Sequence, residues 1–169
     1  MWQDHVKKGC FPDCDMLPVG KVGRGFGEER DTLLTRDEQK TMMTLWCMFR
    51  SPMMVGAELT KLDDWTLNLL TNKELLALLD EGYKGEQIER CEAYAIWKST
   101  NMKAGEKVIA IFNLLDQEAE LSVTLTGVFE LKNTSDITLK ELWDKTEVSI
   151  SGEQLSVKVE SHGVKVYQI

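Results

Sequence analysis

The spacing of apolar and polar residues changes near the middle of the chain. Before about residue 80 the apolar positions recur every three or four residues, which is typical of helices, whereas residues 94–169 alternate in the manner of strands. Residues 80–86 lie between the two patterns, are mostly polar and include two glycines, a composition that favours a boundary. The pattern therefore predicts two parts, residues 1–85 and residues 86–169, in a chain of the α+β class.

The first part begins with a clear helix signal. Thr35 and Glu38 have the spacing of a capping box, in which each side chain accepts a hydrogen bond from the other residue's backbone N–H. One apolar face is predicted for the helix that follows, made of Met42, Leu45, Trp46 and Phe49. Residues 53–56 then form a short apolar run, which predicts a fully buried strand.

Two more helix starts follow this run. Asp63 or Asp64 is expected to cap one helix, and Thr71 with Glu74 shows a second capping-box pattern. The order of helix, buried strand and helices is the rhythm of a β/α fold with a parallel sheet. Because a closed barrel of such units takes eight of them and about 250 residues, we expect residues 1–85 to be an incomplete part of a larger fold.

The second part has the alternation of half-buried strands. Leu121, Val123 and Leu125 fall on one face, and the residues between them are polar. The predicted strands span residues 94–98, 107–114, 119–125, 137–143, 155–159 and 164–169. Polar turns separate them at the spacing expected of an antiparallel β-sandwich.

The net charge of the chain argues against a nucleic-acid partner. The 169 residues carry a formal net charge of −8, and 43% of them are hydrophobic. Nucleic-acid binding needs clustered Lys and Arg to displace counterions, so a nucleic-acid partner is not expected. The sequence contains no apolar run long enough to cross a bilayer, so no membrane partner is expected either.

The four cysteines do not form a metal-binding pattern. Cys10, Cys14, Cys47 and Cys91 contain no CxxC pair, and the closest two lack a second pair that would complete a zinc site. We expect them to be reduced, mostly buried thiols of a cytosolic, hence cytoplasmic, protein. No metal ion and no cofactor is expected.

The most suggestive stretch for chemistry runs from Phe11 to Pro18. Asp13 and Asp15 stand two residues apart and would face the same side of an extended chain. A retaining glycosidase needs carboxyl groups about 5–5.5 Å apart on opposite sides of the sugar carbon, so this pair fits both roles poorly. The alternative from the residues alone is an Asx-turn that holds a loop after Pro12.

Aromatic and histidine residues offer further candidates. The tryptophans Trp46, Trp65, Trp97 and Trp143 lie on apolar faces, where core packing is the usual role and stacking against a sugar is the alternative. His162 is expected in a turn between the last two strands, in a structural or solvated role.

Several segments together resemble one enzyme family. The residues are Phe11-Pro12-Asp13-Cys14-Asp15-Met16-Leu17-Pro18-Val19-Gly20, Leu45-Trp46, Arg50-Ser51-Pro52-Met53-Met54-Val55-Gly56, Leu69-Leu70-Thr71-Asn72-Lys73-Glu74, Ala110-Ile111-Phe112-Asn113-Leu114, Glu141-Leu142-Trp143 and Ser161-His162-Gly163-Val164. In this order they resemble segments of family 27 glycoside hydrolases, the α-galactosidases and their relatives. The resemblance is collinear over nearly the whole chain.

The resemblance implies a fold and a site. Family members have a (β/α)8 barrel followed by an antiparallel β-domain, so residues 1–85 would be the last part of a barrel and residues 86–169 the β-sandwich. Asp15 and Met16 would bind substrate, Asp15 by hydrogen bonding near the sugar and Met16 as apolar wall, just past the seventh barrel strand.

The same resemblance implies that no catalytic residue lies in this chain. The family's nucleophile and acid/base aspartates come from segments earlier than the Pro12 region, and neither segment is present. We therefore expect a C-terminal fragment of a retaining hydrolase for terminal α-linked galactose-type sugars, inactive alone. The alternative is a non-catalytic carbohydrate-binding or structural module. The expected partners are carbohydrate and either a second copy in a homo-oligomer or a missing N-terminal barrel portion.

Overall fold

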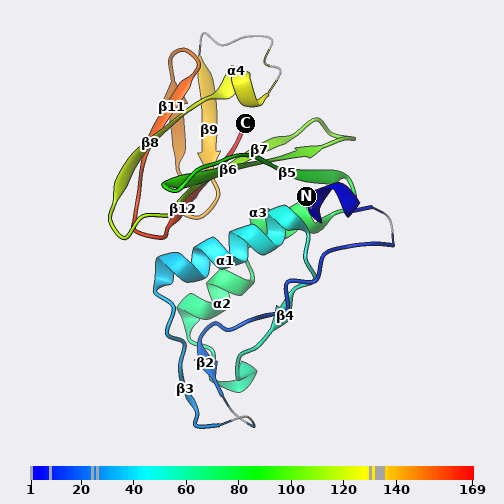
Figure 1. The fold of residues 1–169 in the computed structure, drawn as a ribbon, viewed down its shortest axis with the longest axis vertical. Coiled ribbons are helices and arrows are strands. Elements are labelled where there is room, and N and C mark those ends of the chain that lie inside the picture. The colour runs from blue at the N-terminus through cyan, green and yellow to red at the C-terminus, as the bar shows by residue number, and fades with distance from the viewer. Residues whose placement is uncertain (1, 8, 24, 26, 130, 132–135) are drawn as a thin grey trace.

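The computed structural model describes residues 2–7, 9–23, 25, 27–129, 131 and 136–169. Its centre is an antiparallel sheet of six strands in the order β10-β9-β12-β7-β6-β5 (Figure 1). The strands are β5 (Tyr83–Arg90), β6 (Tyr94–Asn101), β7 (Lys107–Asn113), β9 (Ile137–Glu141), β10 (Glu147–Ile150) and β12 (Val164–Gln168). A second antiparallel pair, β8 (Ala119–Thr124) with β11 (Gln154–Val159), packs on one face, which confirms the predicted β-sandwich.

The central strands bury both of their faces. In β7, Val108, Ala110 and Phe112 pack in one hydrophobic cluster, while Ile109 and Ile111 pack in another. The second cluster lies between the six-stranded sheet and the β8–β11 pair, and the first lies against helix α1 (Arg36–Phe49) on the opposite face (Figure 1). Since successive side chains of a strand point to opposite faces, the unbroken apolar run of β7 reflects cover on both sides.

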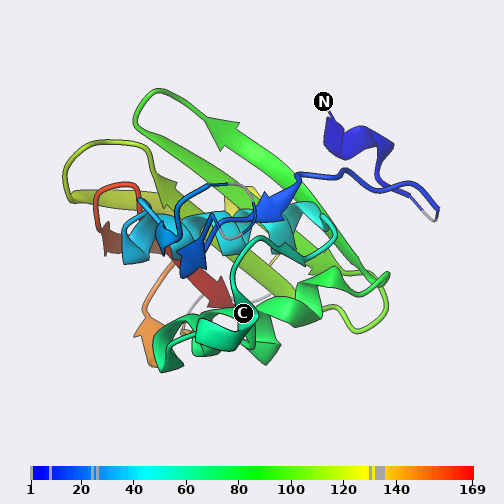
Figure 2. The ribbon, with the colours of Figure 1, turned by 90° about the horizontal axis from the view of Figure 1, so that it is seen from below.

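Helix α1 starts as predicted but buries a different stripe. Thr35 is its N-cap, and the capping box with Glu38 is present. The buried side chains are Met43, Cys47 and Met48, which pack on the six-stranded sheet, and the face expected from the sequence is only half-buried. Seen from below, α1 runs across the sheet (Figure 2). The predicted apolar residues pack only partly against the same cluster, because the sheet covers the neighbouring stripe of the helix.

The only parallel strand pair among the described residues lies on the other side of α1. Strand β1 (Met16–Leu17) pairs with β4 (Met54–Val55), and α1 connects the two, so the predicted β/α rhythm is present as one unit. The expectation of a fully buried strand at β4 is wrong, since Met54 is 41% exposed. The larger barrel arc stays a prediction. A hairpin, β2 (Lys21–Val22) with β3 (Arg30–Asp31), extends away from the sandwich (Figure 1).

Short helices connect β4 to the sandwich. They are η2 (Leu59–Lys61), α2 (Asp64–Leu70), α3 (Lys73–Leu76) and η3 (Ala77–Leu79); η1 (Trp2–His5) and α4 (Leu125–Val128) lie elsewhere. Asp63 caps α2, as one of the two predicted choices. The capping box predicted for Thr71 is wrong: Asn72 caps α3 by accepting from the N–H groups of Glu74 and Leu75, while the Thr71 hydroxyl donates to Leu67 O.

Within the six-stranded sheet, two strands escaped the sequence pattern, and both are its edges. Strand β5 begins inside the polar segment 80–86, and β10 exposes most of its side chains. Gly85 has a packing reason, because a Cβ at this position would lie 1.8 Å from Met48 O at the end of α1. This glycine allows helix and strand to approach closely; the proposed division at residue 85 stays a prediction.

The cysteines are free thiols, but only Cys47 is buried, so the expectation of mostly buried thiols was wrong. Burial raises the pKa of the Cys47 thiol to about 12. Cys10 and Cys91 are exposed. The cytosolic location that the thiols suggested stays a prediction. Within the described residues, no helix is both long and apolar enough to span a membrane.

Candidate functional site

The loop that carries the two neighbouring aspartates is an Asx-turn. The backbone N–H of Asp15 donates to Asp13 Oδ1 at 2.9 Å, which is the loop geometry that the residues offered as an alternative to catalysis. Asp15 has a φ of 67°, in the left-handed region that aspartate tolerates better than most residues. Its own Oδ1 accepts from the Met16 N–H at 2.7 Å.

Helix α1 fastens this loop at two points. The Trp46 indole N–H donates to the carbonyl oxygen of Asp15 at 3.1 Å. Just beyond the helix, Ser51 Oγ accepts from the backbone N–H of Cys14 at 3.0 Å. Sequence reasoning gave neither side chain this role, because the partners lie more than thirty residues away along the chain. The loop is therefore held in place by the helix that also packs on the sandwich.

Asp15 and Met16, the predicted substrate-binding residues, are both exposed. Met16 lies within β1 with 52% of its surface exposed, and Asp15 immediately precedes that strand. The expected position just past a strand therefore differs from the structure, where β1 starts at Met16 and the described residues before it form no strand longer than the Lys7–Cys10 bridge. Their role in binding stays a prediction.

The chemistry open to this loop is limited. An ionised carboxylate accepts hydrogen bonds from hydroxyl groups, and a methionine side chain supplies an adaptable apolar surface. Asp13 and Asp15 come from one turn, and Asp13 uses one oxygen to hold that turn. The pair therefore does not present carboxyl groups on two sides of a sugar, as retaining hydrolysis requires.

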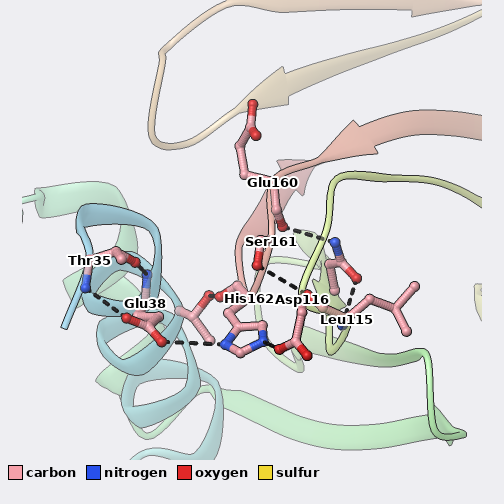
Figure 3. A network of polar contacts seen from close by, with 9 residues as sticks. Thr35, Glu38, Leu115, Asp116, Glu160, Ser161 and His162 are labelled. Carbon is pink, nitrogen blue, oxygen red and sulfur yellow. Dashed lines mark hydrogen bonds and ion pairs between the residues drawn. The ribbon is translucent and has the colours of Figure 1, made fainter.

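His162 joins the sandwich to the start of α1 (Figure 3). Its Nε2 lies 2.8 Å from Asp116 Oδ1, and its Nδ1 lies 3.3 Å from Glu38 Oε1, the same Glu38 that completes the capping box. Its carbonyl oxygen accepts from the Thr41 hydroxyl at 2.7 Å. The residue occupies the predicted turn between β11 and β12 and has a structural role there.

The charges around His162 favour its protonated form. The hydrogen bond with Asp116, followed by that with Glu38, raises the pKa of the imidazole above its ordinary value. Asp37 and Glu160 line the same hollow and add to the negative surroundings. With Asp116 and Glu38 on its two ring nitrogens, His162 acts as a clasp between the sandwich and α1.

The four candidate tryptophans differ in burial and in what they contact. Trp97 is buried in the core at 8% exposure and meets Phe49 edge to face. Trp46 is half-buried and fastens the Asp15 loop. Trp65 and Trp143 are also half-buried, and both line one pocket of about 390 Å³.

In the described part of the chain, no group of three or more His, Cys, Asp or Glu residues gathers closely enough to hold a metal ion.

Comparison with known proteins places these features in a wider group. A family model described as the α-galactosidase C-terminal β-sandwich domain matches residues 92–169. α-Galactosidase 2 of Arabidopsis thaliana is 27% identical over 171 residues, which cover 99% of this chain and 40% of that protein. α-Galactosidase D of Emericella nidulans is 28% identical over 170 residues, covering 98% of this chain and 24% of that protein.

A solved structure extends the similarity to the fold. The crystal structure of the family 27 β-L-arabinopyranosidase from Geobacillus stearothermophilus matches with a TM-score of 0.88 and 36% sequence identity, over 99% of this chain and 38% of that one. A variant of the same enzyme was solved in complex with arabinose. The chain thus spans less than half the length of each of these relatives.

Proposed function

We infer that this chain, which belongs to glycoside hydrolase family 27 and corresponds to the C-terminal part of its enzymes, supplies one wall of a sugar pocket and the β-sandwich behind it. The observation that carries the proposal is the match over nearly the whole chain to α-galactosidases and to the arabinopyranosidase fold. The proposed substrate class of the whole enzyme is terminal α-linked galactose or a closely related sugar. The proposed reaction is hydrolysis with retention.

Asp15 and Met16 are the proposed contacts to the sugar. The Asx-turn and the Trp46 hydrogen bond hold the backbone of Asp15, so its carboxylate is presented without a large entropic cost on binding. One oxygen accepts from the Met16 N–H, and the exposed carboxylate keeps capacity to accept from a sugar hydroxyl. Met16 lies beside it with half of its surface exposed and forms apolar wall.

The chain by itself is proposed to be inactive. Double displacement at a sugar carbon needs a nucleophile on one side and a proton donor on the other. The two carboxylates of the Asp15 loop approach from one side and belong to a single turn. The reaction therefore needs carboxylates from another part of the enzyme.

The proposed partner of the first part is the remainder of the barrel. Met16 and Met54 lie side by side on the β1–β4 pair, and both are exposed. Along α1, the half-buried stripe with Met42 and Leu45 lines a mainly apolar pocket of about 340 Å³. Without the remainder of the barrel, these apolar surfaces favour self-association of the chain. Light scattering measures the mass of the resulting oligomers.

A chimeric enzyme tests the proposal. The C-terminal part of the Geobacillus arabinopyranosidase would be replaced by residues 1–169, and the initial rate measured on chromogenic arabinopyranoside and galactoside. We expect an active chimera in which Asp15→Asn raises KM about tenfold, because a neutral amide accepts more weakly than a carboxylate from a sugar hydroxyl.

Asp13→Asn is the matched control for this substitution. Asparagine forms the same Asx-turn, so the loop keeps its shape and the KM should stay within about twofold of the parent value. If the chimera is folded and active and neither substitution changes its KM, Asp15 does not contact the sugar.

A non-catalytic carbohydrate-binding module is the second candidate. It is favoured by the half-buried pair of tryptophans that lines a pocket away from the Asp15 loop. This candidate does not exclude the first, since one chain can carry both sites.

A further inference from the structure

We propose that the pocket between α1, α2 and the turn after β9 binds a pyranose sugar ring, at a second site separate from the Asp15 loop. Two indole rings from different elements line it, together with a carboxylate and an ammonium group. Its volume of about 390 Å³ falls within the usual range for small-molecule sites.

Helix α2 builds one wall of the pocket. Trp65, Asn68 and Leu69 line it with the spacing i, i+3 and i+4, which places them on one face of the helix, and Asn72 lines it just beyond the helix end. Asn72 is occupied as the cap of α3 and as a donor to Leu142 O, so it fixes the wall. Asn68 is exposed, and its amide can both donate to and accept from a hydroxyl.

The opposite wall is held rigidly. The Trp143 indole N–H donates to Thr44 Oγ1 at 3.1 Å, which sets the plane of the ring. The backbone N–H groups of Trp143 and Asp144 both donate to Glu141 Oε2, at 2.7 and 2.5 Å. Glu141 is only 2% exposed, and burial raises its pKa. A buried side chain therefore shapes the turn before any ligand arrives, which lowers the entropic cost of binding.

The polar groups of the pocket suit a sugar. Asp144 accepts from Lys165 Nζ at 2.8 Å and lies 3.9 Å from Lys40 Nζ, and the bond from Lys165 lowers the pKa of its carboxyl group. The Lys40 ammonium also lies 5.8 Å from the centre of the Trp143 ring. A carboxylate that only accepts, beside an ammonium that only donates, matches neighbouring hydroxyls, which do both.

The indole rings supply an apolar contact surface for the sugar ring. An aromatic face packs against the apolar C–H face of a sugar ring, while the polar groups at the rim fix its orientation. Arg36 lies over Trp65 at 5.0 Å and helps to hold this ring. The pocket beside Met42 differs in that a single indole ring, that of Trp46, lines it.

The two sites lie on different sides of α1. Lys40 lines the pocket, and Thr44, one turn further along the helix, holds the Trp143 ring that lines it. At 3.6 residues per turn, Trp46, which holds the Asp15 loop, projects from nearly the opposite side. A ligand in this pocket would therefore not contact Asp15.

Tryptophan indole signals in a ¹H–¹⁵N correlation spectrum of the chain test the proposal. They would be assigned by single Trp→Phe substitutions and followed during titration with methyl α-D-galactopyranoside, L-arabinose and, as a polyol without a ring, glycerol. We expect saturable shifts of the Trp65 and Trp143 signals with a dissociation constant on the order of 1 mM. The Trp46 and Trp97 signals should stay in place, and glycerol should have no saturable effect.

Two substitutions in the pocket are expected to weaken sugar binding. Trp65→Ala and Asp144→Asn should each weaken binding about tenfold, the first by removing an aromatic face and the second a charged acceptor. Asp31→Asn is the matched control, because Asp31 is also paired with a lysine but lies on the distant β2–β3 hairpin. An unchanged Trp97 signal shows that each variant keeps its core.

Three results would overturn the proposal. They are the absence of a saturable shift with either sugar, a shift confined to Trp46, and equal effects of Asp31→Asn and Asp144→Asn. The first would leave the pocket without a sugar ligand. The second would place binding at the Asp15 loop, and the third would show that surface charge alone is responsible.

Discussion

The six-stranded sheet and the β1–β4 pair differ in how far the rest of the chain covers them. Every residue of β7 after Lys107 is buried, because the β8–β11 pair covers one face and α1 the other. In the parallel pair, by contrast, Met16 and Met54 are exposed side by side. Leu17 of β1 still belongs to the core between α1 and the sheet, so the exposed part of the parallel pair is the face that carries Met16 and Met54.

Helix α1 belongs to both regions. Its stripe with Met43 and Cys47 is part of the sandwich core, and its other side holds the Asp15 loop through Trp46. The comparison therefore predicts that substitutions in the sandwich or at its contact with α1 will affect stability strongly. Substitutions of Met16 and Met54, the exposed residues of the parallel pair, should hardly affect the chain alone.

The largest difference is expected between Ile111 in β7, which is buried, and Met54 in β4, which is exposed. Ile111→Ala should lower the free energy of unfolding by about 2–5 kcal/mol, because it leaves a cavity in a fully covered strand. Met54→Ala should change it by less than about 0.5 kcal/mol, since the side chain is already exposed. Urea unfolding followed by circular dichroism measures both. If both substitutions lowered the free energy of unfolding equally, the two regions would not differ in how well they are covered.

A smaller loss is expected where α1 meets β5. Gly85→Ala places a methyl group against Met48 O and should cost about 1–3 kcal/mol of unfolding free energy as helix and strand move apart. Gly127→Ala in α4 is the matched control, because no atom lies within 4 Å of the added Cβ there. A neutral Gly85→Ala variant would mean that α1 is not packed tightly on the sheet.

The smallest expected effect is a pH dependence at His162. Asp116 and Glu38 raise the pKa of the imidazole in the folded chain. The stabilisation is therefore fully present below the unfolded pKa of about 6.5 and is lost as the pH rises through the higher folded value. The clasp between α1 and the sandwich should thus be stronger in mild acid.

The variant His162→Asn isolates this contribution. Asparagine tolerates the left-handed backbone at this position, where φ is 53°, but carries no titrating group. The difference in Tm between the parent chain and the variant should be larger at about pH 5.5 than at about pH 8.5. A difference that grows with rising pH would contradict the proposed clasp.

The sequence pattern predicted the buried strands of the sandwich better than its edge strands. Alternation located the strands whose faces are buried, such as the one with Leu121 and Val123. It missed β5 and β10 because edge strands carry polar side chains that read as turns. The glycine that suggested a linker proved to be a close contact with α1.

Local signals were reliable only where the interaction itself is local. The capping box of Thr35 is complete within four residues, and it was predicted. The cap of α3 was misplaced by one residue, since Thr71 and Asn72 are both good capping residues and the bond from Asn72 to Leu142 O is distant in sequence. The pocket between Trp65 and Trp143 could not be predicted, because its walls come from three separate elements.

The resemblance to family 27 added what the pattern lacked, and the comparisons confirm it. It singled out Asp15 and Met16, which the pattern alone would have assigned to an ordinary turn. The structure adds the fastening of this loop by Trp46 and Ser51, both close to the end of α1.

The central claim is that this chain carries a wall of the sugar pocket but not the pair of carboxylates that cleaves the bond. The most direct test is a time course of the purified chain alone with 4-nitrophenyl α-D-galactopyranoside. We predict a release of nitrophenol no faster than in buffer. Sustained turnover that disappears in the Asp13→Asn or Asp15→Asn variant would contradict the claim, because these carboxylates would then be catalytic.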